Sequence, residues 1–68
     1  MSDINAIFSV LIRNQNSNVS VQRIRKEAGV SYEAVGKRVY DLRVKGWDIR
    51  TERKNFKGRK TTFYKLAA

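Results

Sequence analysis

The residue types that could do chemistry in this chain are mostly cationic. The sequence contains no histidine and no cysteine, and its six carboxylates are scattered: Asp3, Glu27, Glu33, Asp41, Asp48 and Glu52. This set provides neither a metal-binding cluster nor a nucleophile paired with a general base, so we expect no enzyme, no metal and no cofactor. Against them stand 15 lysines and arginines, a net charge of +9 on 68 residues. That excess predicts a polyanionic partner, because each phosphate that is neutralised releases condensed counterions.

Apolar periodicity predicts three helices that would position these cations. In the first, residues 3 to 14, apolar residues follow the helical spacing i, i+3, i+4, i+7 and i+8 through Ile4, Ile7, Phe8, Leu11 and Ile12. A polar turn at 14–18 ends this helix, and Val19-Ser20 is either a connector or a stub strand. The second helix spans residues 21 to 28. The third runs from about Tyr32 to Lys45, with an inward face of Val35, Val39 and Leu42.

The second and third helices are joined by a short turn, Gly29-Val30-Ser31. Glycine at the end of a helix adopts the left-handed conformation without steric penalty, and Ser31 can cap the next helix, as Ser20 can cap the second. Two helices joined in this way are typical of a helix-turn-helix. Arg25 stands midway along the first of them, where compact repressors usually carry a small residue, and winged variants tolerate this departure more often.

After Gly46 the sequence changes from a helical to an alternating pattern. Residues 47 to 53 alternate, residues 60 to 66 are rich in β-branched and aromatic side chains, and a turn signal lies at 55–58. A lone hairpin is marginal in water, so we expect this one to pack on the helices through Ile49, Tyr64 and Leu66, with Trp47 in the core as its anchor. The predicted fold class is α+β: a winged helix-turn-helix, three helices followed by a two-stranded β-hairpin wing.

The hairpin carries a dense cluster of cations that is opposed only by Glu52. The cluster consists of Arg50, Arg53, Lys54, Lys57, Arg59 and Lys60. Solubility does not require this density, and the mutual repulsion has a cost unless a polyanion relieves it. The tip is either a solvated face, as charge runs usually are, or a wing that lies along a DNA backbone. The second interpretation explains the hairpin and the helix-turn-helix together.

Residues 29 to 51 resemble the N-terminal winged helix of the biotin operon repressor and related small bacterial winged-helix domains. The matching positions are Gly29, Val30, Ser31, Ala34, Val35, Lys37, Val39, Leu42, Arg43, Gly46, Asp48, Ile49 and Thr51, then Tyr64 and Leu66 in the returning strand. The wing here is longer and far more basic, and the 68 residues include no ligase or effector domain. The resemblance implies the fold and DNA binding, and nothing about biotin.

Helical geometry predicts which side chains of the third helix contact DNA. With its apolar residues turned inward, the outward face presents Glu33, Lys37 and Tyr40, flanked by Tyr32 and Gly36. In the N-terminal half of a recognition helix, lysine can donate to guanine, glutamate can accept from cytosine, and glycine permits close approach. Backbone N–H groups beside Ser31 can hold a phosphate. The predicted DNA-binding residues are Ser31, Tyr32, Glu33, Gly36, Lys37, Tyr40, Arg53, Lys54, Lys57, Arg59 and Lys60.

Several side chains keep two interpretations. Tyr32 is either a DNA contact or a core-edge aromatic, and Glu33 either reads a base or only stabilises the first turn of its helix. Further candidates for phosphate contacts are Arg23, Arg38 and Arg43, with Arg38 alternatively packing its stem on the core edge.

The sequence therefore favours a sequence-specific double-stranded DNA-binding protein, either a transcriptional regulator or an architectural factor. The third helix (about 32–45) would lie in the major groove, and the basic wing (50–60) on the backbone or in the minor groove. Phe56 at the wing tip either inserts in the minor groove, touches a sugar face or meets a protein. The alternative is a protein-interaction module acting on a partner such as RNA polymerase, and an RNA-binding winged helix is third. Tight specific binding would need a homodimer or cooperative neighbours, because one domain reads few base pairs.

Length and composition predict one soluble domain over residues 1–68. The absence of cysteine fits a reducing cytosol, and no apolar run approaches the roughly 20 residues of a membrane span. The first three residues also lack the basic segment of a signal peptide. We expect a cytoplasmic protein of a bacterium or a phage-infected cell, associated with the nucleoid when bound to DNA.

Overall fold

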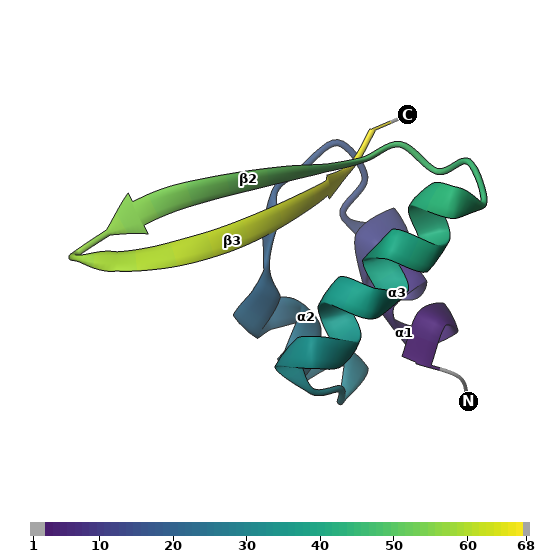
Figure 1. The fold of residues 1–68 in the computed structure, drawn as a ribbon, viewed down its shortest axis with the longest axis horizontal. Coiled ribbons are helices and arrows are strands. Elements are labelled where there is room, and N and C mark those ends of the chain that lie inside the picture. Colours follow the sequence, from purple (N-terminus) through teal and green to yellow (C-terminus); the bar gives the residue numbers. More distant parts are fainter. Residues whose placement is uncertain (1–2, 68) are drawn as a thin grey trace.

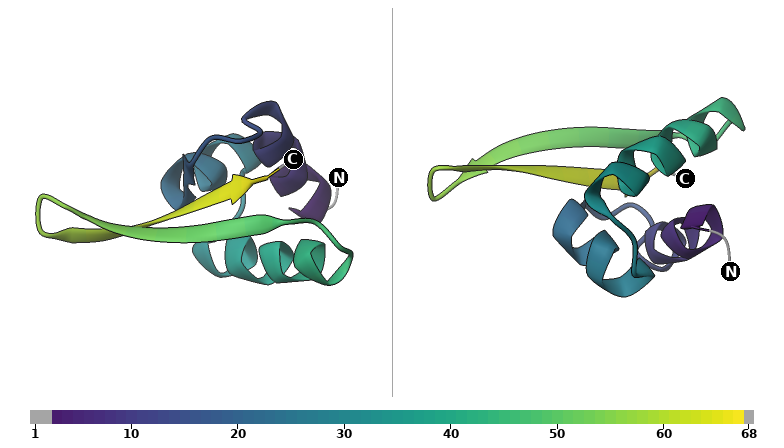
Figure 2. Two further views of the ribbon diagram at one scale, coloured as in Figure 1. Left: turned by 90° about the horizontal axis from the view of Figure 1, so that it is seen from above. Right: turned by 60° about the horizontal axis from the view of Figure 1, so that its bottom comes forward.

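The computed structural model describes residues 3–67, the side chain of Phe56 excepted, and this part of the chain contains three helices and three strands (Figure 1). They are α1 (Asp3–Arg13), β1 (Val19–Ser20), α2 (Val21–Ala28), α3 (Tyr32–Val44), β2 (Ile49–Phe56) and β3 (Arg59–Leu66). The helices pack together, and the β2–β3 hairpin extends well past them as a wing (Figures 1 and 2). The predicted α+β class and winged helix-turn-helix arrangement are confirmed.

The turn between α2 and α3 forms as its residue types predict. Gly29 ends α2 with φ 69° and ψ 37°, in the left-handed region, and its N–H donates to a carbonyl of the last turn at 2.8 Å. The Ser31 hydroxyl caps α3 by accepting from the N–H of Ala34 at 3.2 Å, and Ser20 caps α2 in the same way. These bonds satisfy groups that a helix end leaves open, so both predicted N-caps and the glycine C-cap are confirmed.

A single apolar core lies between the helices and the base of the sheet. Its buried members are Ile7, Val10, Leu11, Val19, Val21, Ile24, Val35, Val39, Leu42, Ile49 and Leu66. The inward face predicted for α3 is therefore confirmed. Ile49 and Leu66 bring the base of the wing into this core, and half-buried Tyr64 packs against it, as the sequence predicted.

The buried face of α1 differs from the predicted apolar stripe. Ile7 and Leu11 are buried, but Ile12 is 43% exposed and Val10 is buried in its place. At 100° per residue, Ile12 lies about 140° around the helix axis from Ile7, whereas Val10 lies only about 60° away. The core covers the arc from Val10 through Ile7 to Leu11, so the prediction for Ile12 is wrong.

The sheet has three strands in the order β1-β3-β2, one more than the predicted hairpin. The two residues of β1 pair antiparallel with β3, with Val19 opposite Tyr64. Both long strands extend towards the tip beyond their predicted bounds, and β2 begins at Ile49 rather than at residue 47. Their pairing runs without a break from Ile49–Leu66 to the last pair before the turn. β3 is therefore paired on both sides, with β1 on one side and β2 on the other, and the β1 pairing joins the base of the wing to the helical part of the fold.

The wing closes in a two-residue turn in which both residues have positive φ. The angle is 51° at Lys57 and 78° at Gly58. This geometry is typical of a type I′ turn, whose twist matches that of the flanking strands. Glycine adopts it freely, whereas an ordinary side chain there costs on the order of 1 kcal/mol, and asparagine is the usual residue. Lys57 thus places a cation at the tip against the local backbone preference.

Trp47 lies at the edge of the core rather than inside it. Its side chain is 44% exposed, and its ring is tilted by 52° against that of Phe8, with 4.7 Å between the ring centroids. Because β2 begins only at Ile49, Ile49 takes the buried position at the base of the wing. The prediction that Trp47 is a core anchor is therefore wrong.

Candidate nucleic-acid interface

Helix α3 presents a polar face that is open to solvent. The outward residues predicted from helical geometry, Tyr32, Glu33, Gly36, Lys37 and Tyr40, are all exposed. Tyr32 is 61% exposed, so its alternative placement at the core edge is wrong. A Cβ built on Gly36 would meet no atom within 4 Å, which leaves the middle of this face free for close approach. The structure therefore brings the predicted recognition residues together on one face.

The strand register divides the wing cations between two faces. Opposite residues in an antiparallel pair project to the same face, and successive residues alternate. Arg53 pairs with Thr62, and Lys60 pairs with Asn55, on the face that carries Tyr64 and Leu66 against the core. We call this the inner face. The other, outer face carries Arg50, Lys54 and Arg59.

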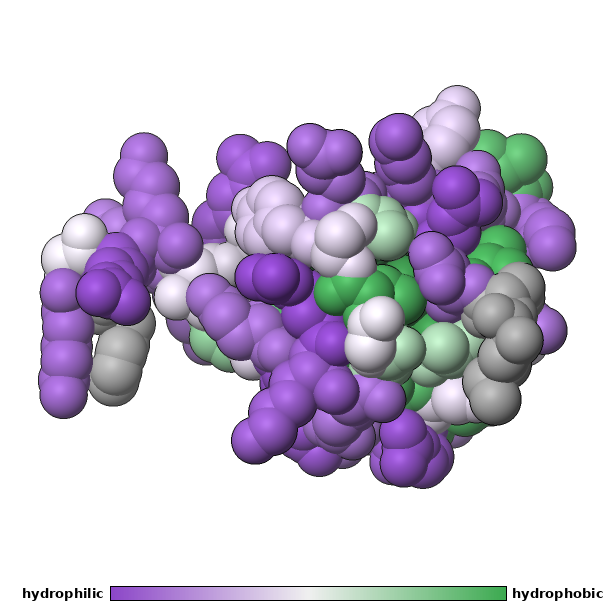
Figure 3. Space-filling view, turned by 90° about the horizontal axis from the view of Figure 1, so that it is seen from below, coloured by the Kyte–Doolittle hydropathy of each residue, from purple (hydrophilic) through white to green (hydrophobic). Residues whose placement is uncertain are grey.

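The inner-face cations Arg53 and Lys60 lie beyond the last core contact of the sheet. Both are exposed, and in the strand register both lie nearer the turn than Tyr64, the last inner-face residue that packs against the core. Figure 3 shows the distal wing as a strip of hydrophilic residues that stands away from the body. Seen from above, the wing runs back along α3 and passes its N-terminal end (Figure 2, left). Two exposed cations of the inner face therefore belong to a wing that runs beside α3.

The acidic residues near the wing leave its cations accessible. Glu52 accepts from the side-chain amide of Asn18 at 2.8 Å and lies 3.6 Å from Lys54, while Asp48 lies 3.6 Å from Arg50. Each side chain in these two ion pairs is at least half exposed, so each pair contributes only ~0–1 kcal/mol and yields readily to a phosphate. Within the described residues, no ion pair involves Arg53, Arg59 or Lys60.

Arg43 joins α3 to the wing. Its Nε donates to the carbonyl oxygen of Ile49 at 2.7 Å, and a second guanidinium nitrogen donates to the Thr51 hydroxyl. These bonds fix the angle at which β2 leaves the helical body. The sequence predicted a phosphate contact for Arg43, which stays a prediction, and the structure adds this anchoring role. Only the fold reveals it, because the two acceptors lie across a turn whose path the sequence leaves open.

Replacing Arg43 with methionine is expected to lower the free energy of unfolding by about 1.5–3 kcal/mol. The reason is the loss of hydrogen bonds from a charged donor to a half-buried carbonyl. Urea denaturation followed by circular dichroism measures the change. Arg25→Met is the matched control, because Arg25 is an exposed arginine on α2, and a change there should stay within about 0.5 kcal/mol. Equal losses in the two variants would show that Arg43 anchors nothing.

The two other arginines proposed for phosphate contacts pair with acids on their own helices. The Nε of Arg23 lies 2.6 Å from Glu27, which also lies 3.7 Å from Arg13. A guanidinium nitrogen of Arg38 lies 2.9 Å from Asp41, and its buried Nε has no hydrogen-bond partner. Arg38 thus packs its stem on the core edge, which was its alternative interpretation. A phosphate contact for Arg23 stays a prediction.

The backbone of Phe56 pairs with Arg59 beside the turn, so its predicted place near the tip is confirmed, while its predicted contact falls outside the described side chains.

Between residues 3 and 67, no group of three or more His, Cys, Asp or Glu side chains is arranged to hold a metal ion. None of the described helices has the length and apolar character needed to cross a bilayer.

The comparisons with known proteins agree with this architecture. A family model described as a winged helix-turn-helix domain matches residues 8–67, nearly the whole chain. No curated protein and no solved structure gave a match, so the resemblance to the biotin operon repressor stays a prediction. Domains of this kind are typically non-enzymatic and have DNA-binding or regulatory roles. The chain belongs to the winged helix-turn-helix family.

Proposed function

We propose that this protein binds double-stranded DNA with sequence specificity, as a transcriptional regulator or an architectural factor. One observation carries the proposal: the exposed face of α3 lies beside a wing (Figure 2) whose inner-face cations, Arg53 and Lys60, are exposed and have no ion pair among the described residues. The major groove, about 12 Å wide, admits a helix, and the adjacent wing then meets the sugar–phosphate backbone or the minor groove. The positive charge supplies affinity for any duplex, and α3 supplies the reading of bases.

Within this arrangement the residues of α3 have different tasks. Lys37 donates to a guanine edge, Glu33 accepts from a cytosine amino group, and Gly36 lets the backbone approach the bases. Tyr32 and Tyr40 flank these contacts with exposed rings. The oxygen of the Ser31 hydroxyl already accepts the capping bond, so this residue contributes its remaining hydroxyl proton and the backbone N–H groups at the start of α3, which suit a phosphate.

Replacing Lys37 and Lys57 separates base reading from backbone contact. Lys37→Ala is expected to lose ~1–3 kcal/mol of binding free energy on the preferred site and much less on random duplex. Lys57→Asn is expected to weaken both duplexes about equally and to reduce the salt slope by about one, because phosphates recur at every step. Asparagine is chosen because it suits the positive φ of the turn. Fluorescence anisotropy with both duplexes measures the four affinities.

Each outcome of that experiment assigns a role. Equal losses for Lys37→Ala on the two duplexes would mean that Lys37 reads no base. A selective loss for Lys57→Asn on the preferred site would mean that the wing reads sequence and that α3 only anchors. The preferred site itself comes from selecting bound sequences out of random duplexes, with the stoichiometry of the complex measured.

A second copy of the chain is the protein partner that we propose. Two exposed apolar residues, Tyr40 and Val44, lie towards the C-terminal end of α3, where they line a shallow hollow with half-buried Ile4 and a polar rim of Arg38, Asp41 and Lys45. Figure 3 shows hydrophobic residues on the body at the end away from the wing. Contiguous exposed apolar surface is typical of an interaction site. In the selection experiment, two-fold symmetric sites that hold two chains support a dimer, and single sites that hold one chain contradict it.

The cellular setting follows from this function. A duplex-binding protein acts where the DNA is, so we place the protein in the cytoplasm of a bacterial or phage-infected cell, on the nucleoid when bound. A protein-interaction module without DNA binding is the second candidate, and the same apolar surface is the observation that favours it. Binding to random duplex that is independent of salt would favour that candidate.

A further inference from the structure

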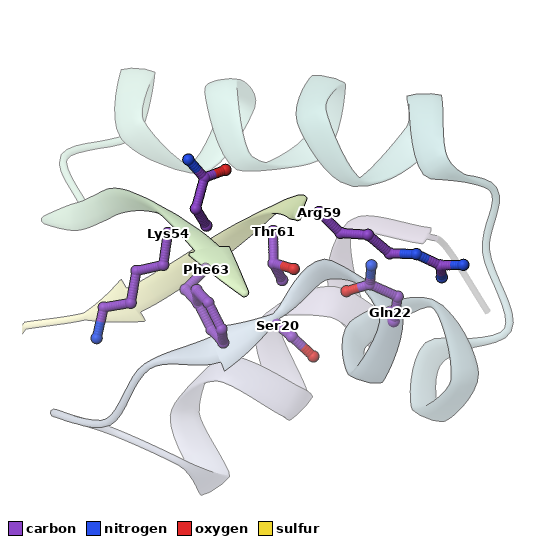
Figure 4. A pocket seen from close by; sticks show the side chains of 7 residues that line it. Ser20, Gln22, Lys54, Arg59, Thr61 and Phe63 are labelled. Carbon is purple, nitrogen blue, oxygen red and sulfur yellow. The ribbon is translucent and has the colours of Figure 1, made fainter. Parts of the chain in front are cut away.

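A groove lies on the outer face of the sheet, where the proposed contacts of α3 do not reach. It has a volume of about 440 Å³, and Figure 4 shows its lining side chains coming from the wing and from the β1–α2 junction. They include Ser20, Gln22, Lys54, Arg59, Thr61 and Phe63. The register explains why most of them meet: Ser20 lies opposite Phe63, and Lys54 lies opposite Thr61, on the face turned away from the core. Asn55, which alternation assigns to the inner face, also borders the groove.

The charges around the groove favour an anion. Lys54 and Arg59 stand on its rim, and Gln22 belongs to the first turn of α2, the positive end of that helix. Among the described side chains that line the groove, none is acidic. Glu52 lies opposite Phe63 on the same face, but Asn18 and Lys54 hold its carboxylate, and it is not part of the lining.

The floor of the groove is aromatic. Phe63 is half-buried on a sheet face that contributes nothing to the core, and the Nζ of Lys54 lies 5.9 Å from its ring centroid. At that distance and exposure the cation–π attraction is weak, on the order of 0.5–1 kcal/mol, so a flat ring can compete for the phenyl face. The volume falls in the range of small-molecule sites, about 300–1,000 Å³, which suits a single nucleotide and not a duplex.

We infer that this groove binds an unpaired nucleotide of single-stranded nucleic acid. The base stacks on Phe63, and the adjoining phosphates pair with Lys54 and Arg59, while the hydroxyls of Ser20 and Thr61 offer hydrogen bonds at the edge. An aromatic platform flanked by cations is the combination that binds single strands without sequence preference, because every base has a π-face. Bases inside a duplex are already stacked on one another and cannot stack on Phe63, so the site takes unpaired bases only.

Two hexamers of equal charge test the inference: hexathymidylate, and an abasic hexamer of the same sugar–phosphate backbone. The parent protein is expected to bind hexathymidylate about tenfold more tightly than the abasic strand, because base–aromatic stacking adds to the same electrostatic attraction. Phe63→Leu should abolish that preference while leaving abasic and duplex binding unchanged. Phe63→Tyr, which keeps the ring, should retain it. Anisotropy measures the affinities, and thermal melts establish that both variants are folded.

A second pair of variants tests the charges. Arg59→Gln should weaken both hexamers alike, by about threefold or more, whereas Lys26→Gln, on the exposed surface of α2, should change neither by more than about twofold. Equal binding of the two hexamers by the parent would overturn the inference, as would a base preference that survives in Phe63→Leu. The inference would also be overturned if Phe63 were needed for binding a peptide of glutamate and phenylalanine but for neither hexamer. That result would assign the groove to a protein partner. If the parent protein prefers hexathymidylate as expected but does not bind a duplex, only the proposed function is contradicted.

Discussion

Replacing Leu42 with alanine is expected to cost ~2–5 kcal/mol of unfolding free energy and to leave much of the protein unfolded. Leu42 is only 4% exposed, in the core that α3 shares with the other helices and the wing. A chain of 68 residues has a total stability of roughly 3–10 kcal/mol at the usual value per residue, so this one loss takes a large share of it. A small core also has few neighbours that can move to fill the cavity.

Urea denaturation followed by circular dichroism measures this loss. Val44→Ala is the matched control, because Val44 lies two residues further along the same helix and is 69% exposed. There the same kind of truncation removes little buried surface, and alanine favours the helix, so stability should change by less than about 0.5 kcal/mol. If the two variants have the same midpoint, the faces of α3 have been assigned the wrong way round.

Affinity for a random duplex is expected to fall about 250- to 1,000-fold when salt rises from 50 to 200 mM. This corresponds to a slope of about −4 to −5 in log K against log salt, as for ~4–6 phosphate contacts. Arg53→Gln and Lys60→Gln should each reduce the slope by about one, because both cations face the proposed DNA path. Lys26→Gln, which changes the net charge equally, should leave it unchanged. A slope near zero would contradict DNA binding through the wing.

Local signals in the sequence were sufficient for the helix-turn-helix. The serine caps and Gly29 act within a few residues of their own position, and the inward face of α3 follows from a period that the helix itself imposes. These features need no knowledge of distant parts of the chain. The same local signals predict the recognition face of α3, because the residues that do not face the core must face outward.

Beyond the packing of Ile49, Tyr64 and Leu66, the features that depend on distant contacts were not predicted. Two residues such as β1 show no alternation, so their pairing with β3 appears only when the chain has folded. Trp47 was expected in the core for its size, but the position where β2 begins decides its burial. The groove was missed for the same reason. Alternation with inward Tyr64 and Leu66 places Phe63 on the outer face, but the side chains that surround it there depend on the β1 pairing and on a register set by the Lys57-Gly58 turn.

The unbroken pairing of the wing limits how its length can change during evolution. Only the base of the hairpin contacts the core, so residues inserted near the tip leave the helical body untouched. Adding one residue to each strand would exchange the two faces beyond the insertion and turn Arg53 and Lys60 outward. Adding two to each strand restores the faces and advances the tip by about 7 Å. Functional wings of this family should therefore differ in length by even steps, each step carrying the same charges to a more distant phosphate.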